Sequence, residues 1–188
     1  GLDAPVDADE IIWTATVFAE TLAVLPPALA QRGAFGFAGR DAEWAQLLGA
    51  WEAVSDGATR LVLVAGEPGI GKTRLAAELA ERALADGGIV LAGRCDELVG
   101  APYQPFAGAL RHLLLSPGGT DRLGPHPGEL VRLAPELADR RGMPAPLVAD
   151  PQAERLRLLE AIRGWFAALS ADQPVLLVLD DLQWADMG

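Results

Sequence analysis

Several residue types are scarce in this chain of 188 residues, which has one cysteine, one lysine and no asparagine. A lone cysteine, Cys95, cannot form an internal disulfide, so the chain is no disulfide-stapled secreted domain, and a reducing compartment suits it. We interpret Cys95 as a small buried apolar residue. The shortage of lysine and asparagine indicates a GC-rich coding sequence and carries no functional information.

Long apolar runs and positive charge are scarce too. No apolar stretch approaches the ~18 residues of a membrane span, and the run from Ile11 to Ala19 follows acidic residues instead of a basic leader. The 26 acidic and 15 basic side chains give a net charge of -11, which opposes direct binding of this segment to nucleic acid or to acidic membranes. We expect a soluble cytoplasmic protein without membrane or nucleic-acid partners.

The apolar content, 51% of residues, is sufficient for one α/β domain with a substantial core. Three short continuous apolar runs are typical of parallel strands covered on both faces: residues 61–65, 89–92 and 175–179. Four amphipathic helices are predicted: from Asp41 as N-cap to Asp56-Gly57, from the glycine loop to about residue 86, from Pro102 to Leu115, and from Asp150-Pro151 to about Ser170.

Two regions give no clear prediction of structure. Residues 1–36 show no period and end in a glycine-rich stretch, as a linker or the tail of an upstream domain would. Residues 120–149 hint at short helices that prolines interrupt. We therefore place the domain itself at residues 37–188.

A glycine-rich loop between the first predicted strand and its helix matches the phosphate-binding pattern GxxxxGK[ST]. Its glycines allow backbone N–H groups to turn toward a phosphate, and the following helix adds its positive end. Lys72 is expected to reach the β- and γ-phosphates and to act in catalysis, and Thr73 to offer its hydroxyl to Mg²⁺. The predicted binding residues are Gly66, Glu67, Pro68, Gly69, Ile70, Gly71, Lys72, Thr73 and Arg74.

An acidic pair, Asp180 and Asp181, ends the last predicted strand in the arrangement called Walker B. A carboxylate at a strand tip can hold hydrated Mg²⁺, a role that we assign to Asp180. Asp181 is the candidate catalytic residue that orients or deprotonates an attacking water. Both motifs follow strands, so the sequence predicts an α/β P-loop NTPase fold with three layers, in which a parallel sheet lies between helices.

Four stretches together resemble the STAND-type, AAA+-related signalling ATPases of large bacterial LuxR-family transcriptional regulators and some multidomain cyclases. The stretches are FAGRDAE from Phe37, GEPGIGKTR from Gly66, GRC from Gly93 with PYQPF from Pro102, and LVLDDLQWAD from Leu177. The likeness spans roughly residues 35–188. Gln183 departs from it, because relatives often have histidine there.

This resemblance implies that Gly39 and Arg40 lie near the adenine side of an ATP pocket. It also implies a switch driven by ATP, with nucleotide-dependent homo-oligomers in a longer parent protein. The family has further strands, a sensor and a lid after Walker B, so we expect the fold to be incomplete at its C-terminus, with an unpaired sheet edge.

The leading hypothesis is an ATP-binding regulatory module with slow or conditional ATP hydrolysis. One alternative is a P-loop kinase for a small molecule, which would need an acceptor pocket and a positively charged lid. Another is a scaffold that binds nucleotide without turnover. The loop alone does not distinguish ATP from GTP, and ATP is preferred through the resemblance.

Overall fold

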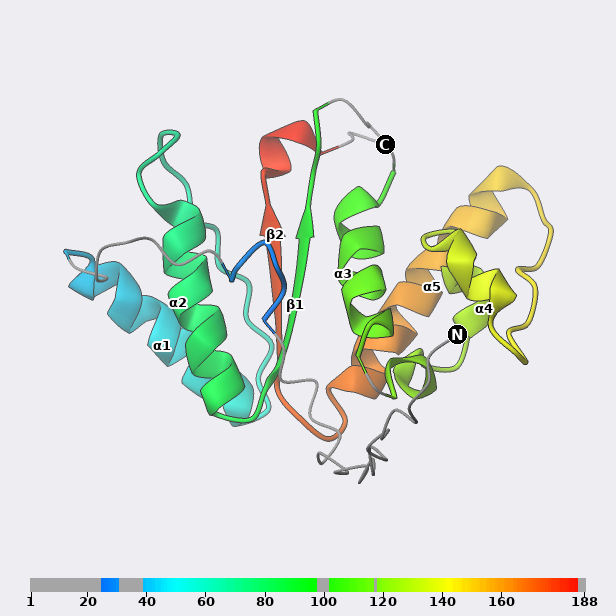
Figure 1. Cartoon of the computed structure of the whole chain (residues 1–188), viewed down its shortest axis with the longest axis horizontal. Coiled ribbons are helices and arrows are strands. Elements are labelled where there is room, and N and C mark those ends of the chain that lie inside the picture. The colour runs from blue at the N-terminus through cyan, green and yellow to red at the C-terminus, as the bar shows by residue number, and fades with distance from the viewer. Residues whose placement is uncertain (1–24, 31–38, 98–101, 117, 186–188) are drawn as a thin grey trace, which may run out of the picture.

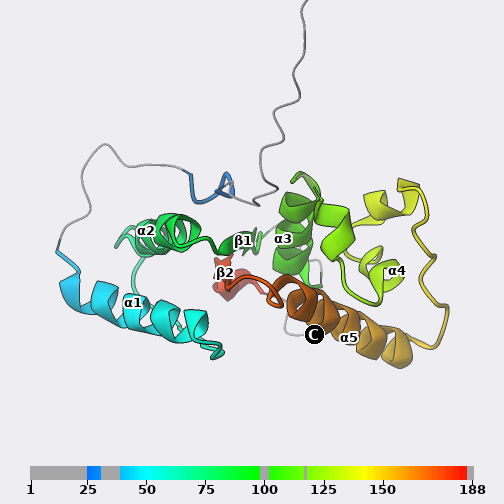
Figure 2. The same cartoon turned by 90° about the horizontal axis from the view of Figure 1, so that it is seen from below.

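A two-stranded parallel sheet lies between two groups of helices in the computed structural model (Figures 1 and 2). The structure describes residues 25–30, 39–97, 102–116 and 118–185. The strands are β1 (Ile89–Arg94) and β2 (Val175–Asp180). The longer helices are α1 (Asp41–Ser55), α2 (Lys72–Ala85), α3 (Gln104–Leu114) and α5 (Pro151–Leu169). The predicted α/β architecture with a parallel sheet is confirmed.

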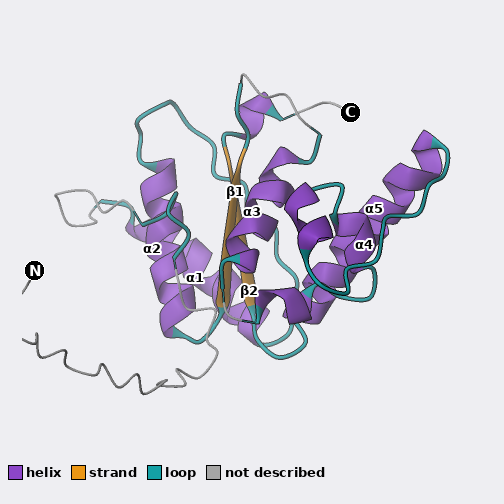
Figure 3. Ribbon diagram, turned by 45° about the vertical axis from the view of Figure 1, so that its right-hand side comes forward, coloured by secondary structure: helices purple, strands orange, loops and turns teal. Residues whose placement is uncertain are grey.

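The connection between the strands consists mostly of helices, as Figure 3 shows. Between α3 and α5 it contains the short elements η1 (Gly119–Arg122), α4 (Pro127–Leu130) and η2 (Pro135–Asp139). After β2 comes one more turn of 3-10 helix, η3 (Leu182–Trp184). Prolines at the first turn of α4 and η2 start these elements where their missing N–H costs no hydrogen bond.

The register of the two strands determines which of their residues lie side by side at the edge of the sheet. Ile89 pairs with Val175 at one end of the ladder and Arg94 with Asp180 at the other. Because the strands are parallel, both C-terminal ends lie at the same edge of the sheet. The amide of Cys95 continues the ladder by donating to the Asp180 carbonyl over 3.1 Å.

Each face of the sheet has its own apolar core, because successive side chains of a strand point to opposite faces. Ile89 and Leu91 pack with α3, α5 and the short elements around the fully buried Trp165. Val90 packs on the other face with α1 and α2, where Trp51 and Leu75 are buried. These two cores fix the sheet between the helical layers.

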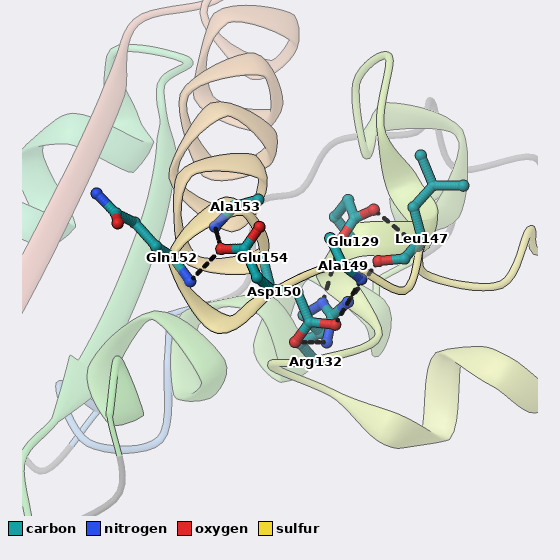
Figure 4. A network of polar contacts seen from close by, with 8 residues as sticks. All are labelled: Glu129, Arg132, Leu147, Ala149, Asp150, Gln152, Ala153 and Glu154. Carbon is teal, nitrogen blue, oxygen red and sulfur yellow. Dashed lines mark hydrogen bonds and ion pairs between the residues drawn. The ribbon is translucent and has the colours of Figure 1, made fainter.

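Of the two N-cap residues predicted from the sequence, one is confirmed and the other is wrong. The Asp150 carboxylate accepts hydrogen bonds from the Gln152 and Ala153 amides at 3.1 and 3.0 Å, so it is the N-cap that the sequence predicts (Figure 4). The prediction for Asp41 is wrong, because Arg40 occupies the cap position and makes no side-chain capping bond. Asp41 instead lies in the first turn, where its charge complements the helix dipole.

The strand expected at residues 61–65 is not formed, which corrects the prediction of three strands. Leu61 and Leu63 are 87% and 77% exposed, and no described residue pairs with this segment. A strand requires a neighbour for its backbone N–H and C=O groups, and an apolar run alone cannot supply one. Strand β2, expected to be buried, is partly exposed along its whole length.

Part of the predicted N-terminal linker packs against the domain. Leu29 is 3% exposed and belongs to the core that contains Trp51 and Leu75. A turn at Pro26 presents it, because the amides of Leu29 and Ala30 both donate to the Pro26 carbonyl. The rest of residues 1–36 lies outside the described residues.

A polar network around the buried Glu129 holds the segment before α5 (Figure 4). Glu129, only 7% exposed, accepts bonds from the Leu147 amide (2.9 Å) and the Arg132 guanidinium (3.1 Å). Arg132 also donates to the Leu147 carbonyl and pairs with Glu154 in the first turn of α5, and Glu154 accepts the Ala149 amide. Burial raises the pKa of Glu129, but its Leu147 and Arg132 partners outweigh burial and lower that pKa below its usual value. The network ties α4 and this segment to α5.

Candidate functional site

The glycine loop immediately precedes α2 and turns the chain into that helix. Gly69 and Gly71 have φ angles of +79° and +93°, in the left-handed region that favours glycine. A Cβ at either position would meet no atom within 4 Å. Their requirement for glycine is therefore conformational, as expected for a loop that turns its amides inward.

Lys72 is the first residue of α2, and its side chain folds back over the loop. Its Nζ donates to the carbonyls of Gly66 at 3.0 Å and Glu67 at 3.1 Å. The ammonium group is therefore held directly beside the glycine loop. These two carbonyls are neutral acceptors, so an anionic oxygen nearby would compete for the same donor.

The two motifs meet at the C-terminal edge of the sheet. Thr73 Oγ1 donates to Asp180 Oδ2 over 2.9 Å, although the two residues lie 107 positions apart in the sequence. The other carboxylate oxygen of Asp180 accepts the Asp181 amide at 2.9 Å. The alternation of side chains along β2 explains this contact, because Asp180 faces the α2 side of the sheet as Val178 does.

Asp181 points toward the tip of β1. Its Oδ2 forms an ion pair with Arg94 Nε at 2.7 Å, and its Oδ1 accepts Gln183 Nε2 at 3.1 Å. The backbone of Asp181 is left-handed, with a φ of +55°, and it begins η3. Both oxygens of the candidate catalytic carboxylate therefore already have partners.

Sequence reasoning missed Arg94 as a member of this site. The sequence does contain a signal for Arg94. Two parallel strands that end together place their last residues side by side, and Arg94 pairs with Asp180 in the ladder. Gln183 was noticed only as a departure from the resemblance. Its contact with Asp181 now places it at the site.

The structure also places the remaining predicted residues. The Arg40 guanidinium donates to the Ile70 carbonyl, which brings the start of α1 to the glycine loop, with Gly39 preceding it in a left-handed conformation. Arg74 pairs with Glu78 along α2 at 2.5 Å and so is engaged on its own helix. The binding roles of these residues remain predictions.

The donor set is suited to a polyphosphate with a hard divalent cation. One ammonium group and a loop of backbone amides can contact phosphate oxygens, and a threonine hydroxyl beside a carboxylate supplies the oxygen ligands that Mg²⁺ prefers. Within the described part of the chain, no three His, Cys, Asp or Glu side chains form a metal-binding group of their own. Nor is any described helix long and apolar enough to cross a membrane.

A protein family model matches most of the chain. A family model described as "AAA ATPase domain" matches residues 36–188, which includes the glycine loop, both strands and the acidic pair. Comparison with curated proteins gives no match, and comparison with solved structures gives none either.

Proposed function

The chain belongs to the AAA ATPase domain family, and from this premise we propose that it is an ATP-binding regulatory module of a larger signalling or transcription-regulatory protein. The family supports nucleotide binding in general terms. The choice of ATP with Mg²⁺, and the role of a slow switch related to STAND-type LuxR-family regulators, rest on the motifs and on the resemblance described above.

One observation carries the proposal: the 2.9 Å contact between Thr73 Oγ1 and Asp180 Oδ2. A hydroxyl from the first motif and a carboxylate from the second share one small volume, next to the glycine loop. This is the pair of oxygen donors that a P-loop NTPase presents to Mg²⁺. Bound there, Mg²⁺ would neutralise charge on the phosphates.

The chain's own residues then divide the work of binding. The backbone amides of the glycine loop and the N-terminus of α2 would hold the phosphates. Lys72, which bonds to neutral carbonyls, would exchange them for charged phosphate oxygens, with which its hydrogen bonds are stronger. Arg40, fastened to the loop at Ile70, would lie beside the nucleotide with Gly39.

Hydrolysis is proposed to be slow because Asp181 is engaged. To orient or deprotonate a water, this carboxylate must turn an oxygen toward that water. Arg94 and Gln183 each bind one oxygen and fix the direction in which the carboxylate points. A conformational step that releases Asp181 would therefore control turnover, which suits a switch better than a continuously working enzyme.

A second candidate function is nucleotide binding without turnover. The same observation favours it, since an Asp181 that stayed bonded to Arg94 and Gln183 would remain turned toward them and away from an attacking water. Binding and phosphate release separate the two candidates. Phosphate release that stops when Asp181 is changed to Asn supports the switch, whereas binding with no release by the wild type supports the scaffold.

The metal side of the site gives a direct test. Mn²⁺ replaces Mg²⁺ in many such sites, and its electron paramagnetic resonance signal reports the bound fraction. With saturating ATP, we expect Asp180→Asn and Thr73→Val each to lower the affinity of the protein for Mn²⁺ by roughly tenfold, which corresponds to about 1.4 kcal/mol. Asp172→Asn, which changes an exposed carboxylate before β2, is the matched control.

Equal Mn²⁺ binding by the wild type, Asp180→Asn and Thr73→Val would refute the metal site.

In the parent protein, ATP-dependent homo-oligomers and a cytoplasmic location complete the proposal. The net charge of -11 supports the further point that this segment does not bind nucleic acid directly.

A further inference from the structure

A cavity of about 390 Å³ opens on the other side of the strand ends from the nucleotide site. Its floor includes Leu179 and Cys95, the residues next to Asp180 and Arg94. Since side chains alternate along a strand, Leu179 faces the α3 and α5 side, while Asp180 faces α2. The volume is within the range of small-molecule sites, roughly 300 to 1,000 Å³.

The first turn of α3 forms one wall, and its position is fixed by close packing. A Cβ on Gly93 would lie 1.8 Å from the Pro105 carbonyl oxygen, so α3 begins directly on the backbone of β1. Gln104 reinforces this position, because its side chain accepts the Asp96 amide at 3.0 Å. Tyr103 and Phe106 thereby line a cavity whose walls are held in place.

The opposite wall is η3, the turn that begins at Asp181. Leu182 and Trp184 line the cavity and are 45% and 44% exposed, although both are large apolar side chains. An occupant would cover these exposed surfaces, which is favourable in proportion to the apolar area buried. It would also contact residues on both sides of the Asp180–Asp181 pair.

Among the described residues that line the cavity, the charged one is Arg155, from the first half of α5. Its Nε donates to the Tyr103 hydroxyl at 3.0 Å. A positive charge beside mostly apolar and aromatic side chains favours a ligand that carries an anionic group. The chemistry of the lining thus specifies both parts of a ligand.

We propose that this cavity binds a compact, largely aromatic or apolar monoanion, and that it is a second ligand site separate from that of the nucleotide. The rings of Tyr103, Phe106 and Trp184 contact the apolar part of the ligand, and Arg155 contacts its anionic group. Binding here does not depend on ATP, so the proposal stands apart from the nucleotide function.

Two fluorescent probes of similar ring size test it in the full chain without nucleotide: the sulfonate 8-anilinonaphthalene-1-sulfonate and the neutral N-phenyl-1-naphthylamine. Ala185→Trp, which fills the cavity from its rim, should weaken both probes at least about fivefold. Arg155→Gln should weaken the sulfonate by a similar factor and leave the neutral probe unchanged.

Two controls separate this cavity from other surfaces. Arg163→Gln removes a charge from an exposed position further along α5, and Leu63→Lys removes apolar surface from the exposed segment at residues 61–64. Both should leave the cavity-specific affinities unchanged. Wild-type binding of both probes by Ala185→Trp would overturn the site. An Arg155→Gln variant that binds the sulfonate like the wild type, or that weakens both probes equally, would overturn the anionic ligand class.

Discussion

At the scale of single residues, Asp181 shows how surroundings determine the use of a side chain. Its place after an apolar strand suggests a carboxylate available to water, but Arg94 and Gln183 hold both of its oxygens. Asp180, its neighbour, is instead paired with Thr73 beside the glycine loop. The two adjacent carboxylates therefore have separate roles: Asp180 faces the proposed metal site, and Asp181 is bound by Arg94 and Gln183.

Replacing Arg94 by Ala should increase ATP turnover without changing ATP affinity. The substitution frees Asp181 Oδ2 while leaving Thr73, Asp180 and the loop in place. An exposed ion pair contributes about 0.2 to 1 kcal/mol, so we expect single-turnover phosphate release to rise by up to roughly fivefold. Arg82→Ala, which removes an exposed pair with Asp86, the residue after α2, controls for the loss of a surface charge. Slower or unchanged release would show that Arg94 does not restrain Asp181.

At the scale of elements, the contact between α3 and β1 is the tightest constraint near the site. Gly93 lies under the first turn of α3, where Pro105 leaves no space for a side chain. The contact holds the end of β1, and with it Arg94, in position beside β2. Packing between two elements thus controls the geometry of the acidic pair.

Gly93→Ala should destabilise the protein by about 3 kcal/mol or more, because overpacking against backbone cannot be relieved by a rotamer change. Gly108→Ala is a matched control on the facing helix, where the added Cβ would meet only ordinary contacts, 3.5 Å from the Gly93 Cα. Urea unfolding followed by circular dichroism measures both free energies of unfolding. A wild-type value for Gly93→Ala would contradict the observed packing.

Elements with a local signal were predictable, and those that depend on distant partners were less so. Asp150 and Pro151 specify the start of α5 by themselves, and the two apolar runs that became β1 and β2 were correctly identified. The equally apolar residues 61–65 form no strand, because pairing depends on a neighbour that the run does not encode. The same holds for the functional residues. The glycine loop and the acidic pair were predicted from local motifs, whereas the cavity depends on how closely α3 approaches Gly93, which no motif encodes.

At the scale of the whole molecule, the two cores differ in how they are tied together. The α1–α2 side is joined by apolar contacts around Trp51 and by the hydrogen bond that its Nε1 donates to Asp86 at 3.0 Å. On the other side, the pair of the buried Glu129 with Arg132 also connects α4 to α5 through Glu154. The free energy of unfolding should therefore depend on the protonation of Glu129.

The folded state lowers the pKa of Glu129, so its contribution is fully present above the unfolded value of about 4.3 and is lost as pH falls through the folded value. Glu129→Gln should cost about 1 to 3 kcal/mol at pH 7. The difference from wild type should shrink as pH falls below about 4. Urea unfolding across this range measures it, with Glu160→Gln, an exposed position on α5, as control. A difference independent of pH would refute the charged role of Glu129.

The central claim is that the chain holds the phosphates of ATP between the glycine loop and Asp180. Isothermal titration of Mg·ATP into wild type, Lys72→Ala and the control Arg82→Ala tests it most directly. We predict one ATP bound per chain and an affinity about 10- to 100-fold lower for Lys72→Ala, the loss of a charged hydrogen bond of about 1.5 to 3 kcal/mol. Arg82→Ala, in the last turn of α2 where its side chain pairs with Asp86, should bind within about twofold of wild type. No binding by the wild type, or equal binding by Lys72→Ala, would contradict the account.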